Sequence, residues 1–392
     1  MRSSSCSKVP PSSDPEQRPF LPYGRQTVDE DDVRAVVEAL RAPFITQGPR
    51  IEAFERALCE TTGAAHAVAV SSGTAALHCC YAAIGLGSGD EIVTSPNTFL
   101  ATANAAVYLG ARPTFADIEP RQQTIDPEHV EARVGDATRA VVAVDFAGHP
   151  ADYSALREIC DRRGLRLIAD ASHSLGAEVR GRRVGTLADL TCLSFHPVKV
   201  ITCGEGGAVL TDDAGLADAC RRFRHHGIVR ESRGDADCPW SYEMPEPGFN
   251  YRITDIQCAL GTSQLRKLAT FVERRRRLAA RYAERLASIP QVELPGEAEG
   301  VGSAWHLYAV GVPAEQRRGV FEALRAAGIG VQVHYIPVYR QPFYRRLLGL
   351  DPTDFPVSER TYSRTISLPL FPTLTDAEQD RVVHELGRAL TP

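Results

Sequence analysis

Lysine is nearly absent from this chain of 392 residues, although basic side chains are common. The 44 basic residues comprise 41 arginines and only three lysines, Lys8, Lys199 and Lys267. A guanidinium serves wherever a positive charge is enough, but it stays protonated and cannot form an imine. A coding bias towards arginine accounts for Lys8, in a polar tail, and for Lys267, among other charges. Lys199 lies between apolar runs and a glycine-rich turn, so chance retention and a chemical role are equally open for it.

Other absences narrow the classes of function. The sequence has no CxxC pair and no HxH or HxxxH pair, so we expect no metal site. Its ten cysteines are irregularly spaced, unlike a disulfide framework. No apolar run approaches the length of a membrane span, and the net charge of −5 does not favour binding to nucleic acid or to an anionic membrane. We therefore expect neither a membrane nor a nucleic-acid partner.

The apolar residues predict an α/β fold with a mostly parallel sheet. Runs of strand length alternate with amphipathic stretches of helix length along the chain. The expected strands are residues 67–70, 91–94, 140–144, 166–169, 190–194 and 207–211. Helical spacing of apolar residues is found at 74–84, 102–109, 152–163 and 375–390.

The same pattern predicts the domain organisation. A single long helix is expected over residues 262–289, ended by Pro290, and it joins a large domain (19–265) to a smaller C-terminal domain (266–392). Residues 1–18 are rich in Ser and Pro and lack the apolar segment of a secretory signal. They predict a disordered tail, and we expect a cytoplasmic protein.

A possible phosphate site lies at Ser-Ser-Gly73-Thr74, where an apolar strand runs directly into a helix. The first N–H groups of a helix are free to bind an anion, and a glycine lets the backbone approach it closely. An ordinary Ser/Thr helix cap produces the same pattern. The turn is not a Walker loop, because no Gly-Lys-Ser/Thr follows at the required spacing.

Two acidic residues end predicted strands. Asp170 closes an apolar run and is followed by His173, and Asp145 ends another run in the same way. Ligands of parallel sheets bind at the carboxyl ends of strands, so either carboxylate suits a binding site. Position alone does not choose between them.

The motifs become informative in combination. Ser194 and Lys199 follow one strand, and Phe99 follows another within Pro-Asn-Thr-Phe. Pyridoxal 5′-phosphate (PLP) requires an amine that holds it covalently, an acid on its ring nitrogen, an aromatic plate and a phosphate site. The sequence contains a candidate for each of these four, so it predicts a PLP enzyme.

The order of these motifs resembles the DegT/StrS family of PLP-dependent nucleotide-sugar aminotransferases. The motifs are SSGTAAL, PNTF, IADASH, SFHPVK followed by GEGG, and GFNYRITDIQCALG. The resemblance runs from Pro22 to the C-terminus. It implies the aspartate aminotransferase-like fold (fold type I), with a mostly parallel sheet in a large PLP-binding domain and a smaller C-terminal α+β domain. It also implies a homodimer with shared active sites.

The resemblance implies a role for each matching residue. Lys199 matches the Schiff-base lysine and Asp170 the partner of the pyridine nitrogen, so these two are the expected catalytic residues. His173 falls near the ring hydroxyl, and Phe99 matches the aromatic that stacks on the ring. Phosphate contacts are implied for Gly73, Thr74, Ser194 and, from the second subunit, Asn250. The segments on the sugar-nucleotide side contain Tyr23, Thr46, Gln47, His334 and Tyr335.

The substrate is predicted from finer similarities. Residues 22–26, 44–48, 194–199, 330–337 and 366–371 are most similar to the pseudaminic-acid-pathway branch, the UDP-4-amino-4,6-dideoxy-N-acetyl-β-L-altrosamine transaminases. We therefore expect an amino group to pass from L-glutamate to the C4 keto group of a UDP-linked 4-keto-6-deoxy sugar. Val200, where we expect proline in that branch, and the stretch 235–247 depart from the pattern. These departures leave a dTDP- or GDP-linked sugar, and amination at C3, as alternatives.

Two further alternatives belong to other classes of protein. A desulfurase of the same fold would need a catalytic cysteine, for which Cys203 is the candidate close after Lys199. A non-catalytic protein could also retain the fold.

Overall fold

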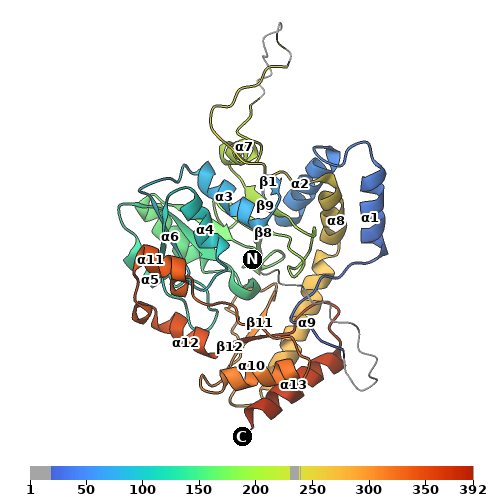
Figure 1. Cartoon of the computed structure of the whole chain (residues 1–392), viewed down its shortest axis with the longest axis vertical. Coiled ribbons are helices and arrows are strands. Elements are labelled where there is room, and N and C mark those ends of the chain that lie inside the picture. Colours follow the sequence, from blue (N-terminus) through green and yellow to red (C-terminus); the bar gives the residue numbers. More distant parts are fainter. Residues whose placement is uncertain (1–18, 230–237, 239, 392) are drawn as a thin grey trace, which may run out of the picture.

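The computed structural model describes residues 19–229, 238 and 240–391, so the expected tail at 1–18 lies outside the described residues. Its main feature is a seven-stranded sheet with the order β1-β9-β8-β5-β4-β2-β3 (Figure 1). The strands are β1 (His66–Val70), β2 (Glu91–Thr94), β3 (Arg112–Phe115), β4 (Thr138–Val144), β5 (Arg166–Asp170), β8 (Leu190–Ser194) and β9 (Gly207–Thr211). Strand β9 alone runs opposite to the other six, which confirms the mostly parallel sheet.

Helices cover both faces of this sheet. Successive side chains of a strand point to opposite faces, so Val142 and Ile168 pack on one side while Val141 and Leu167 pack on the other. The first side is covered by α3 (Gly73–Ala83), α4 (Ala101–Tyr108) and α7 (Ala214–Phe223). The second side is covered by α2 (Pro49–Thr62), α5 (Pro127–Arg133), α6 (Tyr153–Arg163) and α8 (Asp255–Leu265). Burial on both faces explains why the strands read as continuous apolar runs.

The prediction of a single helix over residues 262–289 is wrong, because two helices occupy this region. Helix α8 starts at the capping box of Thr254 and Gln257 and ends at Leu265, and α9 runs over Leu268–Leu286. Helix α8 packs on α1 (Glu30–Arg41) and α2. Helix α9 joins the two cores, because Leu268, Phe271 and Val272 still pack in the core of the large sheet and Leu278, Tyr282 and Leu286 pack in the C-terminal core. In the turn between the helices, Lys267 pairs with the carboxylates of Asp29 and Asp32 at the start of α1.

The C-terminal core surrounds a small antiparallel sheet of β11 (Tyr308–Gly311) and β12 (Thr365–Leu368). Helices α9, α10 (Arg317–Ala326) and α13 (Asp376–Leu390) contribute the side chains packed against it (Figure 1). Helices α11 (Pro342–Leu348) and α12 (Pro356–Arg364) return towards β3 and α4. The remaining short strands are β6 (Glu178–Val179), β7 (Arg182–Arg183) and β10 (Val301–Gly302).

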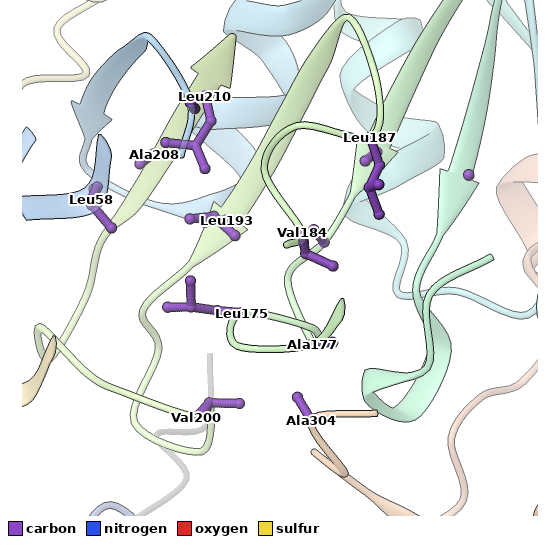
Figure 2. Close-up of a cluster of buried hydrophobic side chains, with 14 of the residues drawn as sticks. Leu58, Leu175, Ala177, Val184, Leu187, Leu193, Val200, Ala208, Leu210 and Ala304 are labelled. Carbon is purple, nitrogen blue, oxygen red and sulfur yellow. The ribbon is translucent and has the colours of Figure 1, made fainter. Parts of the chain in front are cut away.

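The core of the large sheet continues into the loops at one end of its strands. Figure 2 shows Leu175 and Ala177 between the strand residues Leu193 and Ala208 above and Val200 and Ala304 below, and all six belong to one hydrophobic cluster. Val200 is only 5% exposed and directly follows Lys199. The loops that carry polar side chains are therefore anchored by buried apolar neighbours.

None of the described helices is both long and apolar enough to cross a membrane.

Candidate active site

A cavity of about 640 Å³ lies at the carboxyl ends of β4, β5 and β8. Parallel strands leave their polar loop residues at this edge, where ligands of α/β proteins bind. Ten of the residues selected from the sequence line it, namely Tyr23, Gly73, Thr74, Phe99, Asp170, His173, Ser194, Lys199, His334 and Tyr335. Residues from both halves of the chain thus meet in one space.

The N-terminus of α3 forms one end of the cavity. Ser72 caps the helix by accepting a hydrogen bond from the Ala75 N–H at 3.1 Å, so the ordinary cap is present. The N–H groups of Gly73 and Thr74 precede any intrahelical partner and lie at the positive end of the helix. A Cβ at Gly73 would stand 2.9 Å from the Cβ of Ser194. This close approach places the Ser194 hydroxyl beside the turn, and together they suit a phosphate.

Asp170 ends β5 and is nearly fully buried. Its carboxylate accepts hydrogen bonds from the Thr102 hydroxyl at 2.7 Å and the Ser172 hydroxyl at 2.6 Å. Among the described residues no Arg or Lys forms an ion pair with it, so its charge is not neutralised by such a contact. The sequence analysis missed both hydroxyls. A polar residue in the first turn of the alanine-rich α4 was the available signal for Thr102.

The structure distinguishes Asp170 from Asp145, the other strand-end acid. Asp145 is completely buried and does not line the cavity. It accepts hydrogen bonds from the Tyr153 hydroxyl at 2.7 Å, from the Ala151 N–H and from the Ser174 hydroxyl. Burial raises the pKa of Asp145 to about 7. Only Asp170 presents its carboxylate to a ligand.

Lys199 brings an amine into the same cavity. Its surroundings desolvate the ammonium and lower its pKa to about 8, although the negative charge of Asp170 opposes this effect. The amine is therefore readily deprotonated near neutral pH and can act as a nucleophile or a base.

Histidines occupy the side of the cavity near Lys199. The Nε2 atom of His173 lies 3.2 Å from the Tyr335 hydroxyl, and its Nδ1 is buried without a partner among the described residues. Burial and the nearby Lys199 charge hold the pKa of His173 well below its ordinary value, so the ring is neutral. Burial also lowers the pKa of His334 to about 4, and its Nδ1 lies 2.8 Å from the Ser367 hydroxyl.

Phe99 is 59% exposed, so it is not a core residue. It lines the cavity, and its ring centre lies 6.2 Å from that of Tyr335. The rings of Tyr23 and His334, which also line the cavity, lie 5.3 Å apart. The exposed face of Phe99, in a cavity lined by both apolar and polar side chains, suits a flat, charged ring.

Three selected residues lie outside this cavity in the single chain. Thr46, Gln47 and Asn250 are exposed, and none of them lines it. Thr46 pairs with Thr254, and Asn250 pairs with His225, through isolated backbone bridges. The chain therefore does not bring these side chains to its own Lys199.

Known proteins resemble the chain over nearly its whole length. The profile of the DegT/DnrJ/EryC1/StrS aminotransferase family matches residues 26–387. The spore coat polysaccharide biosynthesis protein SpsC of Bacillus subtilis is 38% identical over 372 residues, which cover 93% of this chain and 95% of SpsC.

Solved structures show the same similarity. PseC of Helicobacter pylori, an aminotransferase involved in the biosynthesis of pseudaminic acid, matches with a TM-score of 0.90 and 32% identity, covering 95% of this chain and 99% of PseC. NtdA of Bacillus subtilis, solved with the bound cofactor PMP, matches with a TM-score of 0.85 and 31% identity, covering 96% of this chain and 86% of NtdA.

We predict that Asp145→Asn changes how stability depends on pH. The folded pKa of Asp145 is about 7 and its ordinary value is 3.8, so the native state retains a proton that the unfolded chain loses. The free energy of unfolding therefore contains a contribution that falls as the pH rises from about 4 to 7. The variant lacks this contribution, so its free energy of unfolding relative to wild type should increase as the pH rises from about 5 to 8. Denaturant titration of both proteins at about pH 5 and pH 8 measures this. The same difference between variant and wild type at the two pH values would contradict the prediction.

Proposed function

The chain belongs to the DegT/DnrJ/EryC1/StrS aminotransferase family, and on this basis we propose that it aminates a UDP-linked 4-keto-6-deoxy sugar at C4. The protein is a sugar aminotransferase of fold type I, and its cofactor is PLP. The observation that carries the proposed site is the meeting of the Lys199 amine and the Asp170 carboxylate in one cavity beside the α3 N-terminus. Similarity to PseC over 95% of the chain supports the sugar class.

The residues around the cavity fit PLP. Gly73, Thr74 and Ser194 would hold the phosphate at the positive end of α3. Asp170 would accept a hydrogen bond from the protonated ring nitrogen. The buried Nδ1 of His173, near Lys199, has no hydrogen-bond partner among the described residues and is free to bind a polar group of the cofactor. When bound, PLP supplies an electron sink for the carbanion that forms beside the transferred amine.

The chain's own groups move the protons. Lys199 has a pKa of about 8, so its Nζ can lose its proton, attach the cofactor and later act as a base. We assign to Nζ the removal of the proton from the α carbon of L-glutamate. The same atom would return a proton to the sugar carbon that receives the amine. Since the two half-reactions share one site, the kinetics should be ping-pong.

Asp170 acts through its fixed charge. The hydroxyls of Thr102 and Ser172 hold its two oxygens before any ligand binds, so little reorganisation is needed when positive charge is present on the ring nitrogen. Thr102 and Ser172 are thus positioning residues for Asp170.

We also propose that two chains share their active sites. Thr46, Gln47 and Asn250 are exposed, and the large apolar side chains of Phe44 and Phe249 beside them are 59% and 45% exposed. Exposed aromatics beside polar residues are typical of an interface between protein chains. In a homodimer, Asn250 of one chain would reach the phosphate site of its partner.

The alternative desulfurase function lacks support. Cys203 is only 3% exposed and does not line the cavity. Burial raises the pKa of its thiol well above the ordinary value, which keeps the sulfur protonated and unreactive.

We predict that Lys199→Ala abolishes transamination and the visible absorbance of the bound cofactor, because the covalent link and the base are both lost. Lys199→Arg should be equally inactive, since a guanidinium restores the charge but not the chemistry.

Asp170→Ala should bind PLP weakly and react about a thousandfold more slowly. Absorbance spectra and turnover with L-glutamate test these statements. An active Lys199→Ala variant would refute the proposed chemistry.

The substrate is tested with a panel of UDP-, dTDP- and GDP-linked 4-keto-6-deoxy sugars, each incubated with L-glutamate and the wild-type enzyme. We expect amination of the UDP-linked sugar, detected by mass spectrometry as exchange of the keto oxygen for an amine. Placement of the new amine by NMR distinguishes C4 from C3. Faster conversion of a dTDP- or GDP-linked sugar would replace the proposed substrate without affecting the aminotransferase chemistry.

Shared active sites predict complementation between two defective variants. In a mixed dimer of Lys199→Ala and Asn250→Ala chains, one site carries both changes and the other carries neither. Unfolding and refolding the two together should recover about a quarter of wild-type activity, because about half of randomly formed dimers are mixed. Each variant refolded alone is the control. Sites built from a single chain would show no recovery in the mixture.

A further inference from the structure

A second histidine packs behind His173. The rings of His173 and His306 lie with their centres 4.4 Å apart, and both side chains are almost completely buried. His173 lines the cavity, whereas His306 does not. The Nδ1 atom of His306 has no hydrogen-bond partner among the described residues. Its ring therefore contributes shape and contact rather than a polar link.

A buried arginine of α9 fixes the backbone that carries His306. Arg275 is 1% exposed and forms no ion pair with any described carboxylate, and burial lowers its pKa to about 10. Its Nη1 donates to the carbonyl oxygens of Trp305, His306 and Leu370 at 3.3, 3.1 and 2.9 Å. Burying a cation without a counter-charge is costly, and the three hydrogen bonds offset part of that cost. They also hold the backbone at Trp305 and His306 in place.

The same segment is clamped from the side of the sheet. The Ala304 N–H and the Ser303 hydroxyl both donate to the carbonyl oxygen of Gly148, at 3.0 and 2.9 Å. A Cβ at Gly148 would stand 2.7 Å from the His306 N and 3.1 Å from the His173 carbonyl oxygen. Ala304 itself lies in the hydrophobic cluster under the strands (Figure 2). His306 thus has little freedom to move away from His173.

We propose that His306 is a positioning residue for His173, a rigid support that fixes the His173 ring towards the bound cofactor. The inference rests on the proposed place of His173 in the cofactor site. His173 needs such support, because the Tyr335 hydroxyl at 3.2 Å is its one side-chain hydrogen-bond partner within the described chain. Ring contact from behind restricts the rotation that this bond leaves possible.

Arg275 is also linked to a second segment that lines the cavity. Its third acceptor is the Leu370 carbonyl oxygen, and the Leu370 N–H in turn donates to the Tyr23 carbonyl oxygen at 3.0 Å. Tyr23 lines the cavity and contacts His334. One buried guanidinium therefore ties the support of His173 to the segment that carries Tyr23.

The test is a double-mutant cycle read as the Kd of PLP for the cofactor-free protein. We expect His173→Ala and His306→Ala each to raise this Kd about tenfold, as loss of an outer partner does at other sites. The double variant should have the same Kd as His173→Ala alone, because His306 acts only by positioning the His173 ring, which that variant lacks. His306→Phe keeps a flat ring of similar size and should retain most of the affinity.

His149→Ala is the matched control. His149 is another buried histidine beside Gly148, and its Nε2 accepts a hydrogen bond from the Ala298 N–H away from the cavity. Its removal should lower the free energy of unfolding, as His306→Ala does, and leave the Kd of PLP unchanged.

Two results would overturn the inference. In the first, the effects of His173→Ala and His306→Ala on the Kd are additive, or His306→Ala does not change the Kd. His306 then does not act through His173, and the proposed function is unaffected. If His173→Ala itself leaves the Kd unchanged, the proposed place of His173 fails and the inference fails with it. Turnover of Lys199→Ala reports on the proposed function separately.

Discussion

The burial of the central sheet on both faces is the constraint on which the rest of the structure depends. Strands with apolar side chains towards both helical layers offer no position for polar chemistry along their length. Functional side chains are therefore confined to the strand ends and to the loops that follow them. Asp170 ends β5, Ser194 ends β8, and Lys199 follows within five residues. The sheet collects in one place groups that are far apart in the sequence.

Desolvation then gives these groups their chemical character. The environment that lowers the pKa of Lys199 to about 8 also keeps His173 and His334 neutral. Asp170 is held by two hydroxyls and keeps its charge free for a ligand, whereas Asp145 is sealed in the core with its pKa raised. Asp170 pairs with Val144, so the two acids at the ends of neighbouring strands lie one register position apart. They differ because one faces a cavity and the other faces packed side chains.

The C-terminal part of the chain completes this arrangement. It contributes His334 and Tyr335 to the cavity and, through Arg275 and the segment at 302–307, the backing of His173. Helix α9 allows this, because its first half packs in the sheet's core and its second half packs in the C-terminal core. The exposed Asn250 and its neighbours lie outside the cavity of their own chain, and in the proposed dimer they would face a second copy.

The sequence by itself determined the alternation of strands and helices, because burial on both faces or on one face leaves a periodic pattern of apolar residues. It also selected Lys199 as a candidate, once Asp170, Ser194 and Gly73 were considered together with the rarity of lysine. Only the tertiary structure showed the different surroundings of Asp145 and Asp170, added Thr102, Ser172 and His306, and divided the long helix at residues 266–267. Each of these depends on which distant segment packs against a residue, and periodicity reports only how deeply a residue is buried, not what it is buried against.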